Sequence, residues 1–182
     1  MDRAIATIEL ISIARGFTTA DVMLKSGNVS MLFASPICPG KYLIVVGGQV
    51  GAVENALKNG LETAGEMAVD HSLLPNIHGD IFPAIARATP VSDFKALGIV
   101  ETMSAPAAIE GADAAVKAAR VDLIEIRLGR GMGAKSLFLF TGEIAEARSA
   151  AAAAEKVIAG RGLLVDIAVL TRPHRDLKDF VF

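Results

Sequence analysis

Cysteine and tryptophan are almost absent from this chain of 182 residues, which has one cysteine, Cys38, and no tryptophan. A single cysteine excludes an intrachain disulfide and fits a reducing compartment such as the cytoplasm. With one tyrosine and a net charge of -2, the chain also lacks the stacking side chains and the basic surface of nucleic-acid binders. We therefore expect no nucleic-acid partner.

Long apolar runs are missing as well. The longest stretch without a charge, residues 26–40, is too short to cross a membrane and is interrupted by glycine, asparagine and proline. No basic segment followed by an apolar core opens the chain, so we expect no signal peptide and no membrane partner. Apolar side chains are nevertheless abundant, at 52% against 21% charged, which predicts tight packing between the halves and between chains.

The chain repeats itself after about ninety residues. Such a repeat has to be interpreted before other features, and here it predicts two similar domains, residues 1–90 and 95–182. The copies differ most in one loop, which holds Cys38 in the first copy and several glycines in the second. Four matched pairs illustrate the repeat: Glu9 with Glu101, Asp21 with Asp113, Lys25 with Lys117, and His78 with His174.

Each half has the pattern strand, helix, strand, strand, helix, strand, which predicts an α+β fold of the ferredoxin-like βαββαβ kind. One antiparallel sheet per half should carry helices on a face. In the first half we expect strands at residues 4–13, 29–35, 42–46 and 69–74, and helices from Thr18 or Thr19 to Ser26 and over 50–67. In the second half we expect strands at 97–103, 121–128, 137–140 and 163–170, helices at 106–119 and 143–159, and a short helix and linker at 81–94 before them.

The glycine-rich segment from Gly129 to Ser136 differs by one residue from a phosphate-binding P-loop, because Ala134 replaces the glycine before Lys135. A P-loop leads from a strand into a helix, whereas a strand is expected after Ser136. A nucleotide-binding module is therefore the least favoured function, and a loop between strands is the simpler interpretation.

Two further patterns suggest structural or surface roles. His71, His78 and His174 have no cysteine or second histidine close in sequence, so we expect them to be structural or surface residues. The Asp–Lys pairs at 21 and 25 and at 113 and 117 are spaced as solvated ion pairs on helices. Their presence in both copies suggests a repeated edge contact.

Cys38 leaves two interpretations open. Free cysteine is most often a small buried hydrophobe, but Pro36, Pro39 and Gly40 should form a stiff turn that presents Ile37 and Cys38 at a loop tip. If identical loops met on a rotation axis, three thiolates could hold an iron–sulfur cluster at three of its irons.

Several separated motifs resemble those of tandem-domain bacterial microcompartment (BMC) shell proteins. They are Leu97-Gly98-Ile99-Val100-Glu101-Thr102, Ala112-Asp113-Ala114-Ala115-Val116-Lys117, Gly142-Glu143-Ile144 and Arg172-Pro173-His174. The first half departs from this pattern, because Pro75-Asn76-Ile77-His78 lacks the arginine and the second proline. More narrowly, the Ile37-Cys38-Pro39-Gly40-Lys41 loop is similar to that of the iron–sulfur trimeric shell proteins of the propanediol-utilisation microcompartment.

The resemblance implies a structural protein and not an enzyme, located in a microcompartment shell within the cytoplasm. It implies a homotrimer that imitates a hexameric tile with a central pore, and assembly with other shell proteins; a lumenal redox enzyme is a further candidate partner. Cys38 would be the metal ligand, with one 4Fe-4S cluster per trimer bound by three copies of Cys38 for electron transfer across the shell; the alternative is a metal-free metabolite pore. The residues implied at the pore are Ile37, Cys38, Pro39, Gly40, Gly129, Arg130, Gly131, Met132 and Gly133, and those at the tile edge are Lys25, Lys117 and Arg172.

Overall fold

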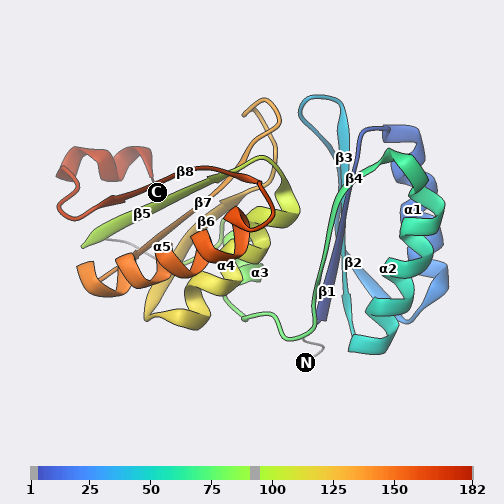
Figure 1. The fold of residues 1–182 in the computed structure, drawn as a ribbon, viewed down its shortest axis with the longest axis horizontal. Helices are drawn as coiled ribbons and strands as arrows, with labels where there is room; N and C mark the ends of the chain where they lie inside the picture. Colours follow the sequence, from blue (N-terminus) through green and yellow to red (C-terminus); the bar gives the residue numbers. More distant parts are fainter. Residues whose placement is uncertain (1–3, 91–94, 182) are drawn as a thin grey trace. The chain divides into compact units, whose positions relative to one another are not determined.

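The structure, a computed structural model, describes residues 4–90 and 95–181 (Figure 1). Two compact units divide the chain: the first holds Met1–Ile77 with Gly129–Ala134, and the second holds His78–Leu128 with Lys135–Phe182. The expected domain limits at residues 90 and 95 stay a prediction, and residues 91–94 of the expected linker lie outside the described part. Among the described residues, no helix is long and apolar enough to span a membrane.

The first unit is a four-stranded antiparallel sheet with two helices on one face (Figure 1). Its strands lie in the order β2-β3-β1-β4, so that β2 and β4 form the edges. The elements are β1 (Ala4–Leu10), α1 (Ile13–Ser26), β2 (Val29–Ile37), β3 (Lys41–Gly48), α2 (Val50–Ala64), a 3₁₀ turn (Gly65–Met67) and β4 (Ala68–Leu74).

The second unit repeats this arrangement, with the strand order β6-β7-β5-β8. The expected α+β fold with two βαββαβ units is therefore confirmed. Its elements are α3 (Ile81–Ile85), β5 (Ala96–Thr102), α4 (Ala105–Ala118), β6 (Val121–Arg127), β7 (Ser136–Gly142), α5 (Ile144–Ala159), β8 (Leu164–Leu170) and a 3₁₀ turn (Arg175–Phe180).

The start of α1 was predicted wrongly. Ser12 is the N-cap, and its Oγ accepts a hydrogen bond of 3.2 Å from the backbone N–H of Arg15. Thr18 instead lies within the helix and donates to the carbonyl oxygen of Ala14, while Thr19 is buried. Position 16 in this helix is a glycine because a side chain there would overlap the ring of Tyr42. A Cβ on Gly16 would lie 2.4 Å from Tyr42 Cγ.

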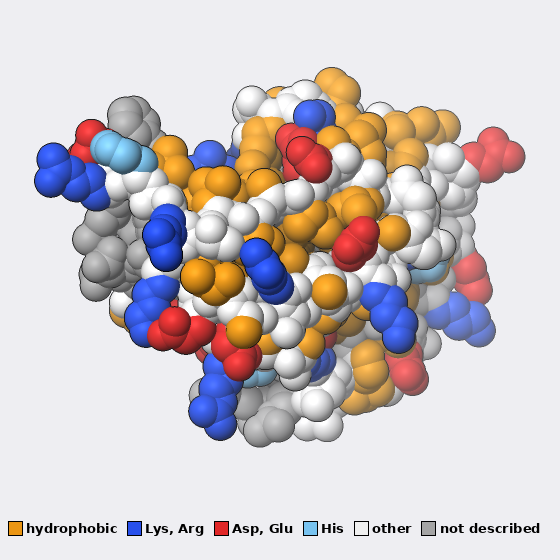
Figure 2. All heavy atoms as spheres, turned by 60° about the vertical axis from the view of Figure 1, so that its left-hand side comes forward, with side chains coloured by type: hydrophobic (Ala, Val, Ile, Leu, Met, Phe, Trp, Pro, Cys, Tyr) orange, Lys and Arg blue, Asp and Glu red, His pale blue; other side chains and the backbone are white. Residues whose placement is uncertain are grey.

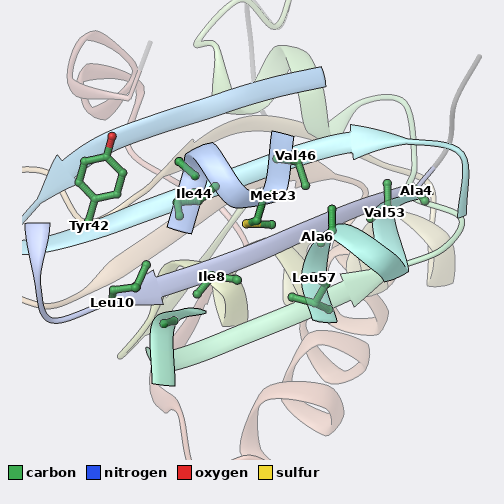
Figure 3. Close-up of a cluster of buried hydrophobic side chains, with 13 residues drawn as sticks. Ala4, Ala6, Ile8, Leu10, Met23, Tyr42, Ile44, Val46, Val53 and Leu57 are labelled. Carbon is green, nitrogen blue, oxygen red and sulfur yellow. The ribbon is translucent and has the colours of Figure 1, made fainter. Parts of the chain in front are cut away.

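The core of the first unit lies between the sheet and its two helices (Figure 3). Alternate residues of the central strands, such as Ile8 and Ile44, point toward Met23 of α1 and Leu57 of α2. Burial of such side chains contributes roughly 1.5 to 3 kcal/mol each, so this layer holds the strands in register and fixes where the β2–β3 hairpin ends.

Candidate pore-loop site

Cys38 lies at the tip of the hairpin between β2 and β3. β2 ends at Ile37, residues 38–40 form the turn, and β3 begins at Lys41. The Cys38–Pro39 peptide is cis and Gly40 has a φ of 79°, a left-handed conformation that favours glycine. Cys38 has a free thiol and the residue is partly exposed, so Cys38 is not a buried core residue.

Ile37 does not share the exposed tip, contrary to the expectation. Its side chain is only 5% exposed and lies against the backbone of Gly129, where a Cβ would come within 2.9 Å of Ile37 Cδ1. The backbone N–H of Cys38 also donates to the carbonyl oxygen of Gly129 over 2.8 Å. The glycine-rich loop therefore packs directly against the base of the cysteine turn, and only glycine fits at position 129.

The segment from Gly129 to Gly133 is a loop between strands β6 and β7, as expected. Gly129, Gly131 and Gly133 have φ values of 64°, 73° and 61°, so alternate residues take the left-handed conformation that glycine allows. No helix follows Lys135, and the context that a P-loop requires is absent. The three glycines therefore allow the backbone conformation of the loop and do not form a phosphate-binding site.

Arg130 folds along β2 and anchors this loop through its side chain. Its Nη2 donates to Ser35 Oγ over 2.9 Å, and its guanidinium lies over the ring of Phe33, 5.2 Å from the centroid. Arg130 was expected at the pore, but these contacts were not predicted, since they join positions 95 residues apart in the chain. Arg130 therefore holds the loop against the strand that leads to Cys38.

Replacing Arg130 with alanine should free the cysteine turn without unfolding the unit. The variant loses a charge-assisted hydrogen bond and a cation–π contact, so we expect alkylation of Cys38 by iodoacetamide to become about threefold to tenfold faster. Arg148→Ala removes an exposed arginine on α5 and is the matched control, which should react like the wild type. Equal rates in all three proteins would show that Arg130 does not restrain the turn.

In both units a lysine is ion-paired with a glutamate of a central strand: Lys41 is the first residue of β3, and Lys135 directly precedes β7. Lys41 Nζ lies 2.7 Å from Oε1 of the fully buried Glu9, and Lys135 Nζ lies 3.0 Å from Oε1 of Glu101. The repeat aligns these residues, yet their pairing was not predicted. Because a buried carboxylate is strongly disfavoured without a partner, Glu9 fixes the residue that follows the cysteine turn.

Glu125 of β6 is a second buried carboxylate with cationic partners. It accepts hydrogen bonds from Nε of Arg87 and from Nε of Arg127, the latter over 2.8 Å. Burial raises the pKa of Glu125, but the hydrogen bonds from Arg127 and Arg87 outweigh it and hold the pKa below its ordinary value. This cluster fixes the end of β6, from which the glycine-rich loop departs.

The residues expected at the tile edge differ between the two copies. Lys25 and its partner Asp21 are exposed and lie 2.6 Å apart, as expected for a solvated pair. Lys117 pairs with Asp113 in the same way, but Asp113 is buried and also accepts a hydrogen bond of 2.7 Å from the backbone N–H of His78. The two ion pairs are therefore not equally solvated. Arg172 is exposed.

The histidines that follow β4 and β8 share one local geometry. The backbone N–H of Asp80 donates to Nδ1 of His78 over 3.4 Å, and that of Asp176 donates to Nδ1 of His174 over 3.3 Å. His71 is exposed on β4. Within the described residues, no three histidine, cysteine or acidic side chains gather as they would around a metal ion.

Comparison with known proteins assigns the family. The BMC domain profile matches residues 4–77 and again residues 96–173. The chain is 43% identical to the bacterial microcompartment shell protein PduT of Citrobacter freundii, over 97% of this chain and 96% of that protein. The chain belongs to the BMC-domain shell protein family.

Two further similarities agree with this assignment. A crystal structure of a microcompartment protein from Desulfitobacterium hafniense DCB superimposes with a TM-score of 0.90 at 43% identity, covering 98% of this chain and 99% of that one. The shell protein EutM of Salmonella typhimurium is 39% identical over 47% of this chain and 86% of its own length, as expected where the relative has about half the length. The chain is thus a structural, non-enzymatic component of a bacterial microcompartment shell, built from two BMC domains.

Proposed function

We propose that this shell protein is a homotrimeric, pseudohexameric tile whose Cys38 turns meet at the central axis and bind one 4Fe-4S cluster. Two similar units per chain and three chains per ring give six similar positions, from which a plane can be tiled through repeated edges. The partly exposed Cys38, with its free thiol, at the tip of the β2–β3 hairpin carries the proposal.

The residues present fit such a cluster only across chains. One chain supplies one thiol, and the described residues contain no other group of metal ligands. Three Cys38 thiolates could ligate three irons of a cubane cluster and leave the fourth open. A bound cluster would accept and release single electrons, which suits a relay across the shell to a lumenal redox enzyme, or a route for cluster delivery.

The two pore-loop types would then have different tasks. The turns with Cys38 would hold the cluster, while the loops from Gly129 to Gly133 carry no thiol and pack against those turns. A ring with six identical loops could not divide these tasks. The duplication therefore supports a threefold metal site within a nearly sixfold tile.

Anaerobic purification of the full chain tests the proposal. Light scattering should give the mass of a trimer, and iron and sulfide analysis should give about four of each per trimer. Anomalous scattering from crystals should place iron on the threefold axis beside Cys38. A colourless trimer that takes up no iron after reconstitution would instead support the metal-free metabolite pore.

The tile edges are tested separately through Lys25 and Lys117. Replacing both with alanine should leave soluble trimers and weaken the formation of extended sheets, seen by electron microscopy and by sedimentation of assembled material. Lys58→Ala with Lys156→Ala removes the same charge from exposed positions on the other helix of each unit and should leave sheets intact. Normal sheets from the first double variant would contradict the edge assignment.

A further inference from the structure

Asp113 of the second unit accepts a hydrogen bond that has no counterpart at Asp21 among the described residues. The segment after β4 runs to α3, which packs on β6 and α4. At the start of this segment the backbone N–H of His78 donates to Oδ1 of Asp113 over 2.7 Å, and the Asp113 side chain is only 5% exposed. The segment after β4 therefore covers one face of α4 at Asp113.

The matching face of α1 is uncovered in the single chain. Asp21 corresponds to Asp113 and has a side chain that is 58% exposed. Phe17 is 61% exposed, whereas Ile109 at the matching position of α4 is fully buried. Large apolar side chains do lie at the surface among the charged ones (Figure 2), but an exposed phenylalanine next to an exposed acceptor is the pattern of an interface.

The chain also carries a second copy of the segment that would fit there. His174 and Asp176 follow β8 as His78 and Asp80 follow β4, and both pairs form the same backbone-to-imidazole hydrogen bond. The second segment thus shares this local hydrogen bond with the segment that already binds an aspartate in the second unit. Within the described residues, no hydrogen bond from the His174 backbone N–H to an aspartate is found.

We propose that the segment after β8 of one chain docks on α1 of the next chain, where the His174 backbone N–H donates to Asp21. The occupant is a second copy of this protein, and the contact between chains reproduces the His78–Asp113 contact within one. Because donor and acceptor lie on different surfaces, the interface is head-to-tail, and three such contacts close a ring. The inference rests on the proposed trimer and assigns the residues that join its chains.

The residues beyond Asp176 are not needed for this contact. In the single chain Leu177 and Val181 pack against Leu97 and Leu139 on the sheet of their own unit. The docking segment is therefore defined as residues 172–176, which end before the packed Leu177 and include the first two residues of the 3₁₀ turn. Their exposed histidine and aspartate side chains leave them accessible to a neighbour.

Chemical cross-linking of the full chain tests the contact. In a Cys38→Ala background, Asp21→Cys combined with His174→Cys should give covalent dimers and trimers on a denaturing gel after treatment with a short bis-maleimide. The matched control, Asp113→Cys with His78→Cys, should cross-link within one chain and stay at monomer mass. Each single variant measures the background.

The outcomes separate the contact from the trimer itself. If light scattering gives a trimer but the first pair stays at monomer mass on the gel, the contact is wrong and the trimer stands. If the Cys38→Ala parent and the wild type are both monomers, the trimer fails and the contact falls with it. A ladder from the His78 and Asp113 pair equal to that of the test pair would also overturn the inference, since the two contacts would then not differ.

Discussion

Replacing Cys38 with alanine should abolish iron binding and leave the trimer intact. Each chain has one thiol, so a single substitution removes all three proposed ligands at once. After anaerobic reconstitution with iron and sulfide, the wild type should hold about four irons per trimer and the variant only background iron. Because Cys38 lies in a turn at the end of the hairpin, its loss should leave the free energy of unfolding within about 0.5 kcal/mol of the wild type.

A substitution elsewhere in the hairpin distinguishes loss of the thiol from a general disturbance of the hairpin. Ala34→Ser changes an exposed residue of β2, the strand that leads to Cys38, and should retain iron, trimer mass and the visible spectrum of the wild type. Iron that persists in Cys38→Ala at the wild-type ratio would show that other residues bind it. A colourless wild type would remove the relay and leave the metal-free pore.

The fold could be predicted from the sequence because the repeat and the local patterns agree. Strand and helix periodicities identified every strand of both units and both of their long helices. The one clear error was the start of α1, where Ser12 caps the helix in place of Thr18 or Thr19. Ser12 corresponds to Ser104, which caps α4 in the same way, so the repeat did contain the missing signal.

The candidate site was predictable only in part, because its contacts join distant segments. The hairpin tip with Cys38 follows from its prolines and glycine. The burial of Ile37 under Gly129 and the anchoring of Arg130 on Phe33 require the loop of one repeat to meet the hairpin of the other. Local propensity carries no information on such pairs.

Equivalence between the repeats was also overestimated. Asp21 and Asp113 have matching positions on their helices, and each pairs with the lysine four residues later. Asp21 is nevertheless exposed, whereas Asp113 is buried. The difference arises from the segment after β4, since His78 reaches Asp113 within one chain. Sequence alignment shows that two positions match, but it does not show which neighbours cover them.

Replacing Gly98 with alanine should destabilise the second unit, because the position is filled by the ring of Phe140. The two residues are directly paired between β5 and β7, and a Cβ on Gly98 would lie 2.2 Å from Phe140 Cζ. Phe140 is fully buried beside Phe138, with ring centroids 6.0 Å apart, so its ring has no free space. Overpacking of this kind costs about 1 to 3 kcal/mol, which exceeds the roughly 0.5 to 1 kcal/mol that alanine gains over glycine in a strand.

The first unit shows how the clash can be relieved. Its matching pair is Ala6 and Val46. Ala6 is larger than Gly98, and Val46 is smaller than Phe140, so the two side chains fit together. Phe140→Val alone should cost about 2 to 3 kcal/mol through the cavity it leaves. In that background, Gly98→Ala should no longer destabilise and should add up to about 1 kcal/mol of stability, so that the effect of the same substitution changes sign.

Urea unfolding of the four proteins measures this coupling. The midpoint should fall for each single variant and should not fall further when Gly98→Ala is added to Phe140→Val. Gly51→Ala is the control, because a Cβ there meets no atom within 4 Å and alanine favours the helix. Additive losses in the double variant would mean that Gly98 is required by the strand itself and not by the ring opposite, and the packing difference between the repeats would then need another cause.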